Sequence, residues 1–238
     1  MVLRGGDHRV SGRRIGADDA LRDYLDSHGL KMIRRQLARS GALEIIATAT
    51  PGIKDLLVLG KVKQLEQELP PETLMILDAP AAGHAMTFLD SARAMLDTAR
   101  GGPLRSQAAQ VLELLSDHER AQLVLCAIPE ETPINELIQT AFQVEDRLNI
   151  RLGPIIINGC LSLPSGLDGV VDGRGEADRA ARELQAFYRA RNELQRSQLA
   201  RLDEELPLPQ VRLPQLPTPS IDNDALDTLA LALIGDAS

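Results

Sequence analysis

Aromatic residues are nearly absent from this sequence. Its 238 residues include no Trp, two Tyr and three Phe, so aromatic side chains make up 2% of the chain. Proteins that bind single-stranded nucleic acid usually stack the bases on aromatic side chains. The formal net charge of -8 also argues against nucleic acid or an anionic membrane as a partner, because both require clustered positive charge. The core must therefore be aliphatic, which suits a β-sheet covered by helices.

Cysteines and long hydrophobic runs are also scarce. The two cysteines, Cys126 and Cys160, each lie in or beside an apolar run, and we expect both to be reduced and buried. The sequence contains no Cys-x-x-Cys motif, so a structural zinc site is not expected. No apolar run is long enough to span a membrane, and the first residues contain no signal-like hydrophobic region. We therefore expect a soluble, cytoplasmic protein without stable membrane insertion.

A phosphate-binding loop is missing as well. Such a loop requires Gly-x-x-x-x-Gly-Lys-Ser/Thr directly after a strand, because its backbone amides and its lysine hold the phosphates. The only Gly-Lys pair is Gly60-Lys61, with Asp55 in place of the first glycine and Val62 in place of Ser or Thr. This pair falls within a helical pattern, so we interpret it as part of a helix.

What the sequence does contain is an alternation of apolar runs and helical periodicity. Three short runs are predicted to be strands that are buried on both faces, as in a parallel sheet. These runs are residues 74–77, 123–128 and 153–157. Helical spacing between them, at 85–120 and 132–148, predicts strand–helix–strand–helix–strand, which is typical of a right-handed α/β fold.

Further elements are predicted on both sides of this region. Helices are expected at 17–25, 31–43, 53–69, 176–205 and 222–234, a strand at 10–15 and an edge strand at 210–213. We expect Asp18 or Asp19 to cap the first helix and Asp222 or Asn223 to cap the last. The helix at 176–205 is expected to lie on the surface and to pack through a weak apolar stripe, which contains Leu184, Phe187, Leu194, Leu199 and Leu202.

The residues from Leu74 to Phe88, LMILDAPAAGHAMTF, contain the most informative motif. A strand that ends at Asp78 would place a carboxylate at the carboxyl edge of a parallel sheet, where such sheets bind ligands. In nucleotide hydrolases an aspartate at this place holds Mg²⁺. Pro80 and Gly83 would then form a tight turn near a phosphate. Local chemistry alone is equally compatible with Asp78 as a cap of the next helix.

This motif resembles the switch II signature of the ArsA family, which comprises arsenite-pump ATPases and ATPases that target tail-anchored membrane proteins. The resemblance continues through ATATPGIKDLLVLGKVKQLEQ at 47–67, Gly-Gly-Pro at 101–103, Pro-Glu-Glu-Thr-Pro at 129–133 and Ile-Ile-Ile-Asn at 155–158. It covers residues 15–235 and is strongest to the actinobacterial branch. It implies a deviant P-loop NTPase-like α/β fold of the dimeric-switch class, with a mostly parallel sheet flanked by helices. Residues 1–238 would form one domain, with a helical subdomain at about 17–70 and 85–120.

The resemblance also implies roles for individual residues. Asp78 would be the magnesium-linked aspartate, and Gly83 and His84 would belong to the turn that senses the γ-phosphate of ATP. Asn158 would hydrogen-bond adenine, although from local chemistry we favour a turn residue before Gly159. The loop 213–217, with Leu213 and Pro214, would lie over the adenine, although its prolines could equally be structural. The family usually has Thr where this sequence has Ala82.

The family places its phosphate loop and first βαβ unit before the region where this sequence begins. We therefore expect the chain to begin inside the domain and to be inactive as an ATPase alone. ATP and Mg²⁺ would be used with a P-loop-bearing paralogue, in a homodimer or heterodimer, or with an upstream segment that belongs to the same protein. Arsenite binding is disfavoured, because neither cysteine lies in the helical insertion. The alternative is a non-catalytic interaction protein that binds a hydrophobic client helix, motivated by the amphipathic segment 53–69.

Overall fold

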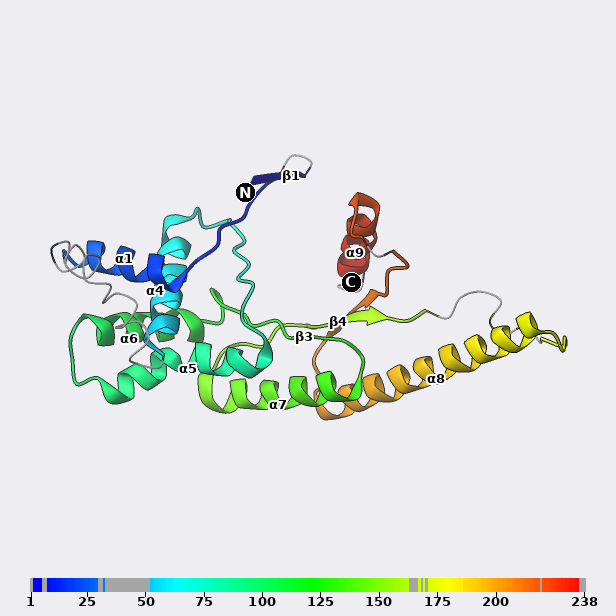
Figure 1. Ribbon diagram of the computed structural model, residues 1–238. Helices are drawn as coiled ribbons and strands as arrows, with labels where there is room; N and C mark the ends of the chain where they lie inside the picture. Colours follow the sequence, from blue (N-terminus) through cyan, green and yellow to red (C-terminus); the bar gives the residue numbers. More distant parts are fainter. Residues whose placement is uncertain are drawn as a thin grey trace. The chain divides into compact units, whose positions relative to one another are not determined.

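The computed structural model describes residues 2–5, 8–29, 32, 52–162, 167, 169, 171–218 and 220–235. The chain forms two compact units. Figure 1 shows the ribbon, coloured from the N-terminus to the C-terminus. The first contains residues 1–121 and 147–149, and the second contains residues 122–146 and 150–238. The predicted helix at 31–43 lies outside the described residues except for Met32, and so does Pro51.

The first unit begins with a two-stranded hairpin. Strands β1 (Val2–Gly5) and β2 (His8–Ser11) pair antiparallel, with Val2 opposite Ser11. The strand predicted at 10–15 is therefore wrong over most of its length, because β2 ends at Ser11 and residues 12–15 pair with no described strand. A strand needs a neighbour to satisfy its backbone groups, and β1 begins at Val2, which lies opposite Ser11.

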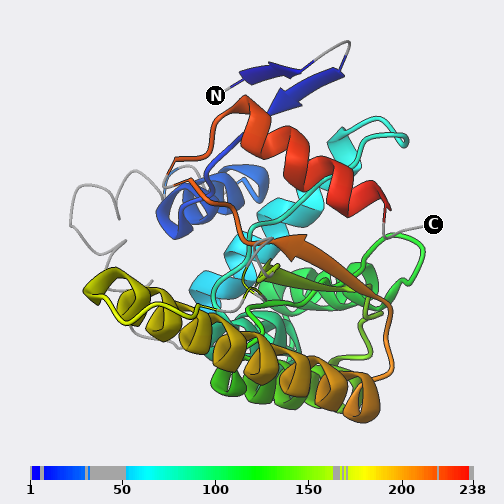
Figure 2. The same cartoon turned by 90° about the vertical axis from the view of Figure 1, so that its right-hand side faces the viewer.

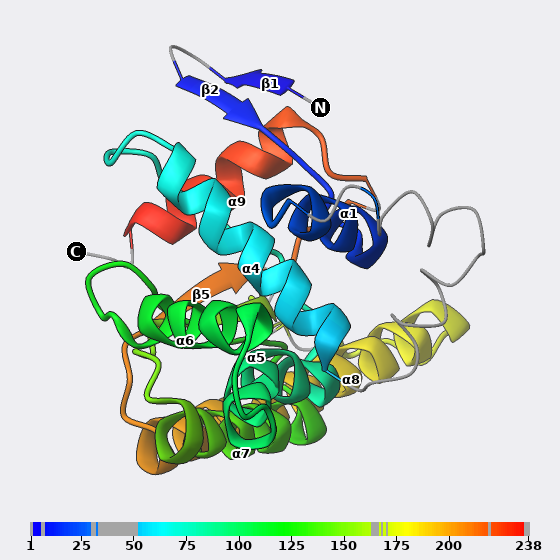
Figure 3. The same cartoon turned by 90° about the vertical axis from the view of Figure 1, so that its left-hand side faces the viewer.

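Four helices lie in the continuous described ranges of this unit, and Figure 3 shows them. They are α1 (Ala17–Ser27), α4 (Ile53–Glu68), α5 (Ala82–Thr98) and α6 (Pro103–Ser116). Helix α4 contacts the other three, and its side chains Leu56, Leu57 and Leu59 are at most 2% exposed. The amphipathic pattern at 53–69 therefore serves to pack α4 within its own unit.

Glycines and a proline set two of the helix starts. Gly52 and Gly102 have φ values of 84° and 93°, a left-handed region that favours glycine, and each precedes a helix. Pro103 occupies the first position of α6, where its missing N–H costs nothing. At α1 the expected cap is wrong: Gly16 precedes the helix, and Asp18 and Asp19 lie in its first turn.

Two arginines tie the helices of this unit together. Arg120, which follows α6, forms a two-pronged ion pair with Glu66 of α4, with Nε–Oε1 and Nη2–Oε2 distances of 3.0 and 2.9 Å. The hydrogen bond to Glu66 raises the pKa of Arg120. Arg105 of α6 donates hydrogen bonds to the backbone oxygens of Leu96 and Ala99 at the end of α5. These contacts satisfy carbonyls that the end of α5 leaves open.

The second unit contains a three-stranded parallel sheet in the order β3-β4-β5. Its strands are β3 (Cys126–Ala127), β4 (Ile155–Cys160) and β5 (Gln210–Pro214). Both pairings are parallel, as predicted, with Cys126 opposite Ile156 and Ile156 opposite Val211. The strand predicted at 123–128 is shorter than expected, although Leu123 also forms a parallel bridge with Leu152.

Helices pack on both sides of this sheet, although the face that carries Cys126 is exposed at β3. Figure 2 shows α7 (Glu131–Leu148) and α8 (Glu176–Glu205) on one side and α9 (Asn223–Gly235) on the other. The core on the α7 and α8 side includes Ile134, Ile155, Ile157 and Leu202, each fully buried. The Asp222 carboxylate accepts a hydrogen bond from the Ala225 N–H at 2.9 Å, which confirms Asp222 as the cap of α9.

Candidate functional site

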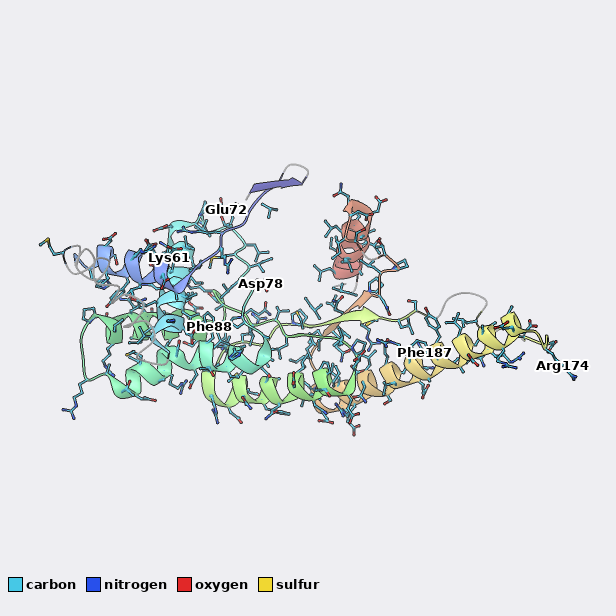
Figure 4. All side chains as sticks on the ribbon, viewed as in Figure 1. Lys61, Glu72, Asp78, Phe88, Arg174 and Phe187 are labelled. Carbon is cyan, nitrogen blue, oxygen red and sulfur yellow. The ribbon has the colours of Figure 1, made fainter. Side chains whose placement is uncertain are left out.

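Asp78 lies in an irregular stretch before α5, as Figure 4 shows. The strand predicted at 74–77 is wrong: these residues pair with no described strand, and Leu74 and Ile76 are each 82% exposed. Without a neighbouring strand, an apolar run cannot form a ladder, whatever its β-propensity. Asp78 is exposed and makes no hydrogen bond or ion pair with the described residues, so its carboxylate is open to a cation.

The alternative interpretation of Asp78 as a helix cap is also wrong. Helix α5 begins after Ala81, and no side chain caps it. The backbone N–H groups of His84 and Ala85 both donate to the Ala81 carbonyl, at 2.8 and 2.9 Å. The positive end of the α5 macrodipole therefore begins three residues after the Asp78 carboxylate.

Gly83 and His84 lie in the first turn of α5, and not in a separate turn before the helix as the sequence predicted. Both residues are exposed, and a side chain at Gly83 would meet no atom within 4 Å. Packing among the described residues therefore does not require glycine at this position. His84 makes no hydrogen bond with the described residues, so both residues present open surface beside the N-terminal turn.

Asn158 lies within β4 and not at its end. The strand continues to Cys160, but its register with β5 shifts between Ile157 and Cys160. Gly159 has a φ of 72°, which favours glycine and allows this irregularity. The side chain of Asn158 is exposed, whereas Ile155 and Ile157 of the same strand are fully buried.

Leu213 and Pro214 lie on β5, beside the irregular part of β4. Pro214 is opposite Cys160, and the Gln215 N–H donates to the Cys160 carbonyl at 2.8 Å. Proline is tolerated here because β5 is an edge strand of the described sheet. The structure therefore brings Asn158, Leu213 and Pro214 together at the carboxyl edge of two adjacent parallel strands, where open α/β sheets bind ligands.

The six predicted site residues fall into two groups. Asp78, Gly83 and His84 belong to the first unit, and Asn158, Leu213 and Pro214 belong to the second. Sequence reasoning missed the side chains that hold the backbone around Asn158, because they come from α8, more than 30 residues later. Gln195 of α8 contacts both Gly159 and Leu161, and Asn192 contacts Leu161. The available signal was the run of polar residues at helical spacing along α8.

The Gly60-Lys61 pair lies inside α4, as predicted. The Lys61 side chain is 10% exposed, and its Nζ lies 2.6 Å from the Asp23 carboxylate of α1. Gly60 faces the end of the Gln107 side chain of α6, so a side chain at position 60 would require Gln107 to move. Both residues thus have packing roles between helices, and neither belongs to a phosphate-binding loop.

Polar hollows in the first unit contain none of the predicted site residues. The larger, of about 480 Å³, is lined by Arg14, Asp19, Arg22, Lys54 and neighbouring residues. A second, of about 290 Å³, adjoins Asp23 and Lys61. Both are open and mix acidic with basic groups, so their charge selects no particular ligand.

Cys126 and Cys160 lie on β3 and β4 of the second unit. The expectation that Cys126 is buried is wrong, because its side chain is exposed on the face opposite the α7 and α8 core. Partial desolvation by its neighbours nevertheless raises the pKa of the Cys126 thiol. No disulfide joins Cys126 to Cys160. Among the described residues, no three His, Cys, Asp or Glu side chains form a cluster that could hold a metal ion.

The helices in the described part of the chain do not have the character of membrane spans. None of them combines the length and the apolar composition that crossing a bilayer requires.

Comparison with known proteins identifies relatives of this chain. It is 30% identical over 184 residues to a protein named "ATPase BagA" from Mycobacterium tuberculosis and to one named "Putative ATPase Mb3704" from Mycobacterium bovis. The match covers 74% of this chain and 53% of each relative, so the chain spans about half the length of these proteins. No protein-family model matches the chain. The chain is thus a homologue of proteins named as ATPases.

Proposed function

We propose that this chain is part of an ArsA-family ATPase. In this proposal, residues 1–238 form an ArsA-like domain that binds and hydrolyses ATP only when a P-loop-bearing partner or an upstream segment completes it. The 30% identity to two mycobacterial proteins named as ATPases carries the proposal. The parallel sheet of the second unit supports it, because sheets of this type bind ligands at their carboxyl edge.

Asp78, Gly83 and His84 form the phosphate-side part of the proposal. The Asp78 carboxylate is exposed and has no partner among the described residues, so its oxygen atoms are suited to hold the water shell of Mg²⁺. When bound, Mg²⁺ would neutralise charge on the phosphates during transfer. Gly83 and His84 are exposed in the first turn of α5, which begins four residues after Asp78.

Asn158, Leu213 and Pro214 form the base-side part. The carboxamide of Asn158 both donates and accepts hydrogen bonds, which matches the edge of adenine. Leu213 and Pro214 are half-buried on the adjacent strand and offer an apolar surface next to it. The base would thus find one polar group and one apolar surface, the usual composition of a small-molecule site.

Hydrolysis by the chain alone is not expected. Phosphoryl transfer depends on positive charge and on backbone amides around the phosphates. In a phosphate loop the lysine supplies charge and the loop backbone supplies amides. The only Gly-Lys pair lies inside α4, where Lys61 is paired with Asp23. The proposed partner is therefore a second ArsA-like chain with a phosphate loop, in a heterodimer in the cytoplasm. A homodimer would serve only if an upstream segment of the same protein supplies that loop.

Measurement of ATP binding and phosphate release tests this proposal. We expect weak binding and no turnover by the 238-residue chain alone, and turnover once a P-loop-bearing paralogue from the same genome is added. Asp78→Asn should lower Mg²⁺-dependent turnover of the completed enzyme at least about 100-fold, as expected for loss of a charged contact to the transferred group. Asp97→Asn, an exposed carboxylate on α5, is the control and should leave turnover unchanged. Turnover unaffected by Asp78→Asn would contradict the assignment.

A non-catalytic interaction function is the second proposal. Several apolar side chains of α9 favour it, because Leu226, Leu231, Leu233 and Ile234 are between 45% and 71% exposed. Such a surface suits the apolar face of a client helix. Absence of ATP binding, both alone and with the paralogue, would favour this function over the first.

A further inference from the structure

One face of α8 carries a row of polar side chains that hold a preceding stretch of the chain. Positions three or four residues apart on a helix point to the same side. This α8 polar face consists of Arg182, Gln185, Arg189, Asn192 and Gln195. Each of these side chains hydrogen-bonds the backbone between Gly159 and Gly173.

The contacts follow one another in reverse order along the sequence. Arg182 Nη1 donates to the Gly173 oxygen at 2.7 Å, and Gln185 Nε2 donates to the Gly169 oxygen at 2.9 Å. Arg189 Nη2 donates to the Leu167 oxygen at 3.1 Å. The described residues of this stretch therefore meet α8 in the order opposite to its own direction.

Gln195 differs from the other members of this face. Its side chain is 4% exposed, and both ends of its amide are engaged with the backbone. The Leu161 N–H donates to Oε1 at 2.8 Å, and Nε2 donates to the Gly159 carbonyl at a longer 3.4 Å. Gln195 thus binds the backbone of both Gly159 and Leu161, which lie one and three positions after Asn158.

We propose that Gln195 is a positioning residue that sets the orientation of Asn158, and through it the preference of the site for adenine. This inference rests on the proposed function. Asn158 precedes a glycine with a φ of 72° in a stretch of irregular register, where the backbone has more freedom than in a regular ladder. The buried amide of Gln195 fixes the peptide groups on the far side of that glycine.

The physical basis is the cost of leaving a buried polar group without a partner. Rotation of the Gly159 peptide would break its contact with Gln195 and leave part of the buried amide unsatisfied. The direction of Asn158 depends on this backbone, because side chains alternate between the faces of a strand and a slip of one residue reverses them. Loss of the Gln195 amide should therefore leave the Asn158 carboxamide in place but less firmly oriented.

A comparison of two glutamines on α8 tests the proposal. Gln195→Met removes both hydrogen bonds and keeps the approximate volume of the side chain. Gln198→Met is the matched control, because Gln198 is also buried on α8, at 8% exposure, and its Oε1 has no donor among the described residues. The 238-residue chain is titrated with adenosine and guanosine by ligand-observed NMR, which probes the base-binding part without the phosphates.

The expected result is a loss of about five- to tenfold in the preference for adenosine over guanosine in Gln195→Met, the size of one or two hydrogen bonds. Gln198→Met should keep the preference of the unchanged chain. Hydrogen exchange should show faster exchange of the Leu161 amide in Gln195→Met alone. Asn158→Ala should remove the preference altogether.

The outcomes separate the two proposals. An unchanged preference in Gln195→Met, or an equal loss in Gln198→Met, would overturn the positioning role while nucleotide binding stands. If the preference for adenosine is unchanged in Asn158→Ala, Asn158 does not recognise the base, and the role of Gln195 is overturned with it. If neither nucleoside binds and ATP does not bind in the presence of the paralogue, the proposed function fails and the inference fails with it.

Discussion

At the scale of single residues, identical side chains on one helix have different surroundings. Gln195 and Gln198 lie one turn apart on α8, and both are buried. Gln195 satisfies its amide with the backbone that follows β4, whereas Gln198 Oε1 has no donor in the described part of the chain. Burial of a polar group is unfavourable unless a hydrogen bond compensates it. The two glutamines should therefore respond in opposite ways to an apolar replacement.

Gln198→Met should raise the free energy of unfolding by about 1 kcal/mol, because it removes an uncompensated buried carbonyl and keeps the volume. Gln195→Met should lower the same free energy by about 1–3 kcal/mol, since the Leu161 N–H loses its acceptor. Urea unfolding of both variants checks these values. Equal destabilisation by both changes would show that the contacts of Gln195 contribute no more than its packing.

Tyr24 predicts a pH dependence of stability. Burial of its phenol in the α1 region raises the pKa of Tyr24 above its ordinary value of 10.0. The unfolded chain therefore loses this proton first as the pH rises. The stabilising contribution is complete below about pH 10 and decreases as the pH rises from the unfolded pKa toward the folded one.

Tyr24→Phe should flatten this decrease, because phenylalanine has no proton to lose. Urea unfolding at several pH values between about 8.5 and 11 measures it, and the difference between the two proteins isolates Tyr24 from the lysines. The two profiles should diverge above about pH 10. Parallel profiles over the whole range would contradict the effect of burial.

At the scale of elements, α8 shows how far a sequence pattern can be trusted. The apolar stripe predicted along residues 176–205 is only half correct, because Leu199 and Leu202 are buried but Leu184, Phe187 and Leu194 are 46–58% exposed. The N-terminal half of α8 is held instead by its polar face, which contacts the stretch up to Gly173. An apolar stripe predicts a packing partner, and the pattern does not reveal that polar side chains hold this half.

Arg182→Ala should release the start of this stretch. It removes hydrogen bonds to the Val171 and Gly173 carbonyls, each worth about 0.5–1.5 kcal/mol in an accessible place. Hydrogen exchange of amides 171–175 should become about tenfold faster. Arg179→Ala is the matched control, because Arg179 lies one turn earlier and its side chain makes no hydrogen bond with the described residues. Equal acceleration in both variants would contradict the role of Arg182.

At the scale of the whole molecule, each unit has a separate apolar core. One gathers Leu21, Leu25 and Leu57 between α1 and α4, and the other gathers Ile155, Ile157 and Leu202 beneath the sheet. Between α4 and α5, the apolar run that contains Leu74 and Ile76 joins no strand in the described part of the chain. Exposed apolar segments with β-propensity favour pairing with other chains.

The double change Leu74→Ser with Ile76→Ser should therefore reduce self-association and leave the free energy of unfolding within about 0.5 kcal/mol, because both side chains are 82% exposed. Sedimentation velocity at increasing protein concentration measures the association. Leu231→Ser, at 71% exposure on α9, shows whether any exposed leucine has the same effect. If association persists in the double variant and falls in Leu231→Ser, the surface that mediates self-association lies on α9 and not at residues 74–76.

The sequence by itself determined most helices and the parallel pairing of the second sheet. Periodicity located α4, α7, α8 and α9 within a few residues, because their apolar spacing already defines the side that must be buried. Tertiary structure decided which apolar runs become strands, because a strand exists only with a neighbour that accepts and donates its hydrogen bonds. It also decided that Gln195 meets Gly159 and Leu161, a contact between residues more than 30 positions apart that no local pattern can specify.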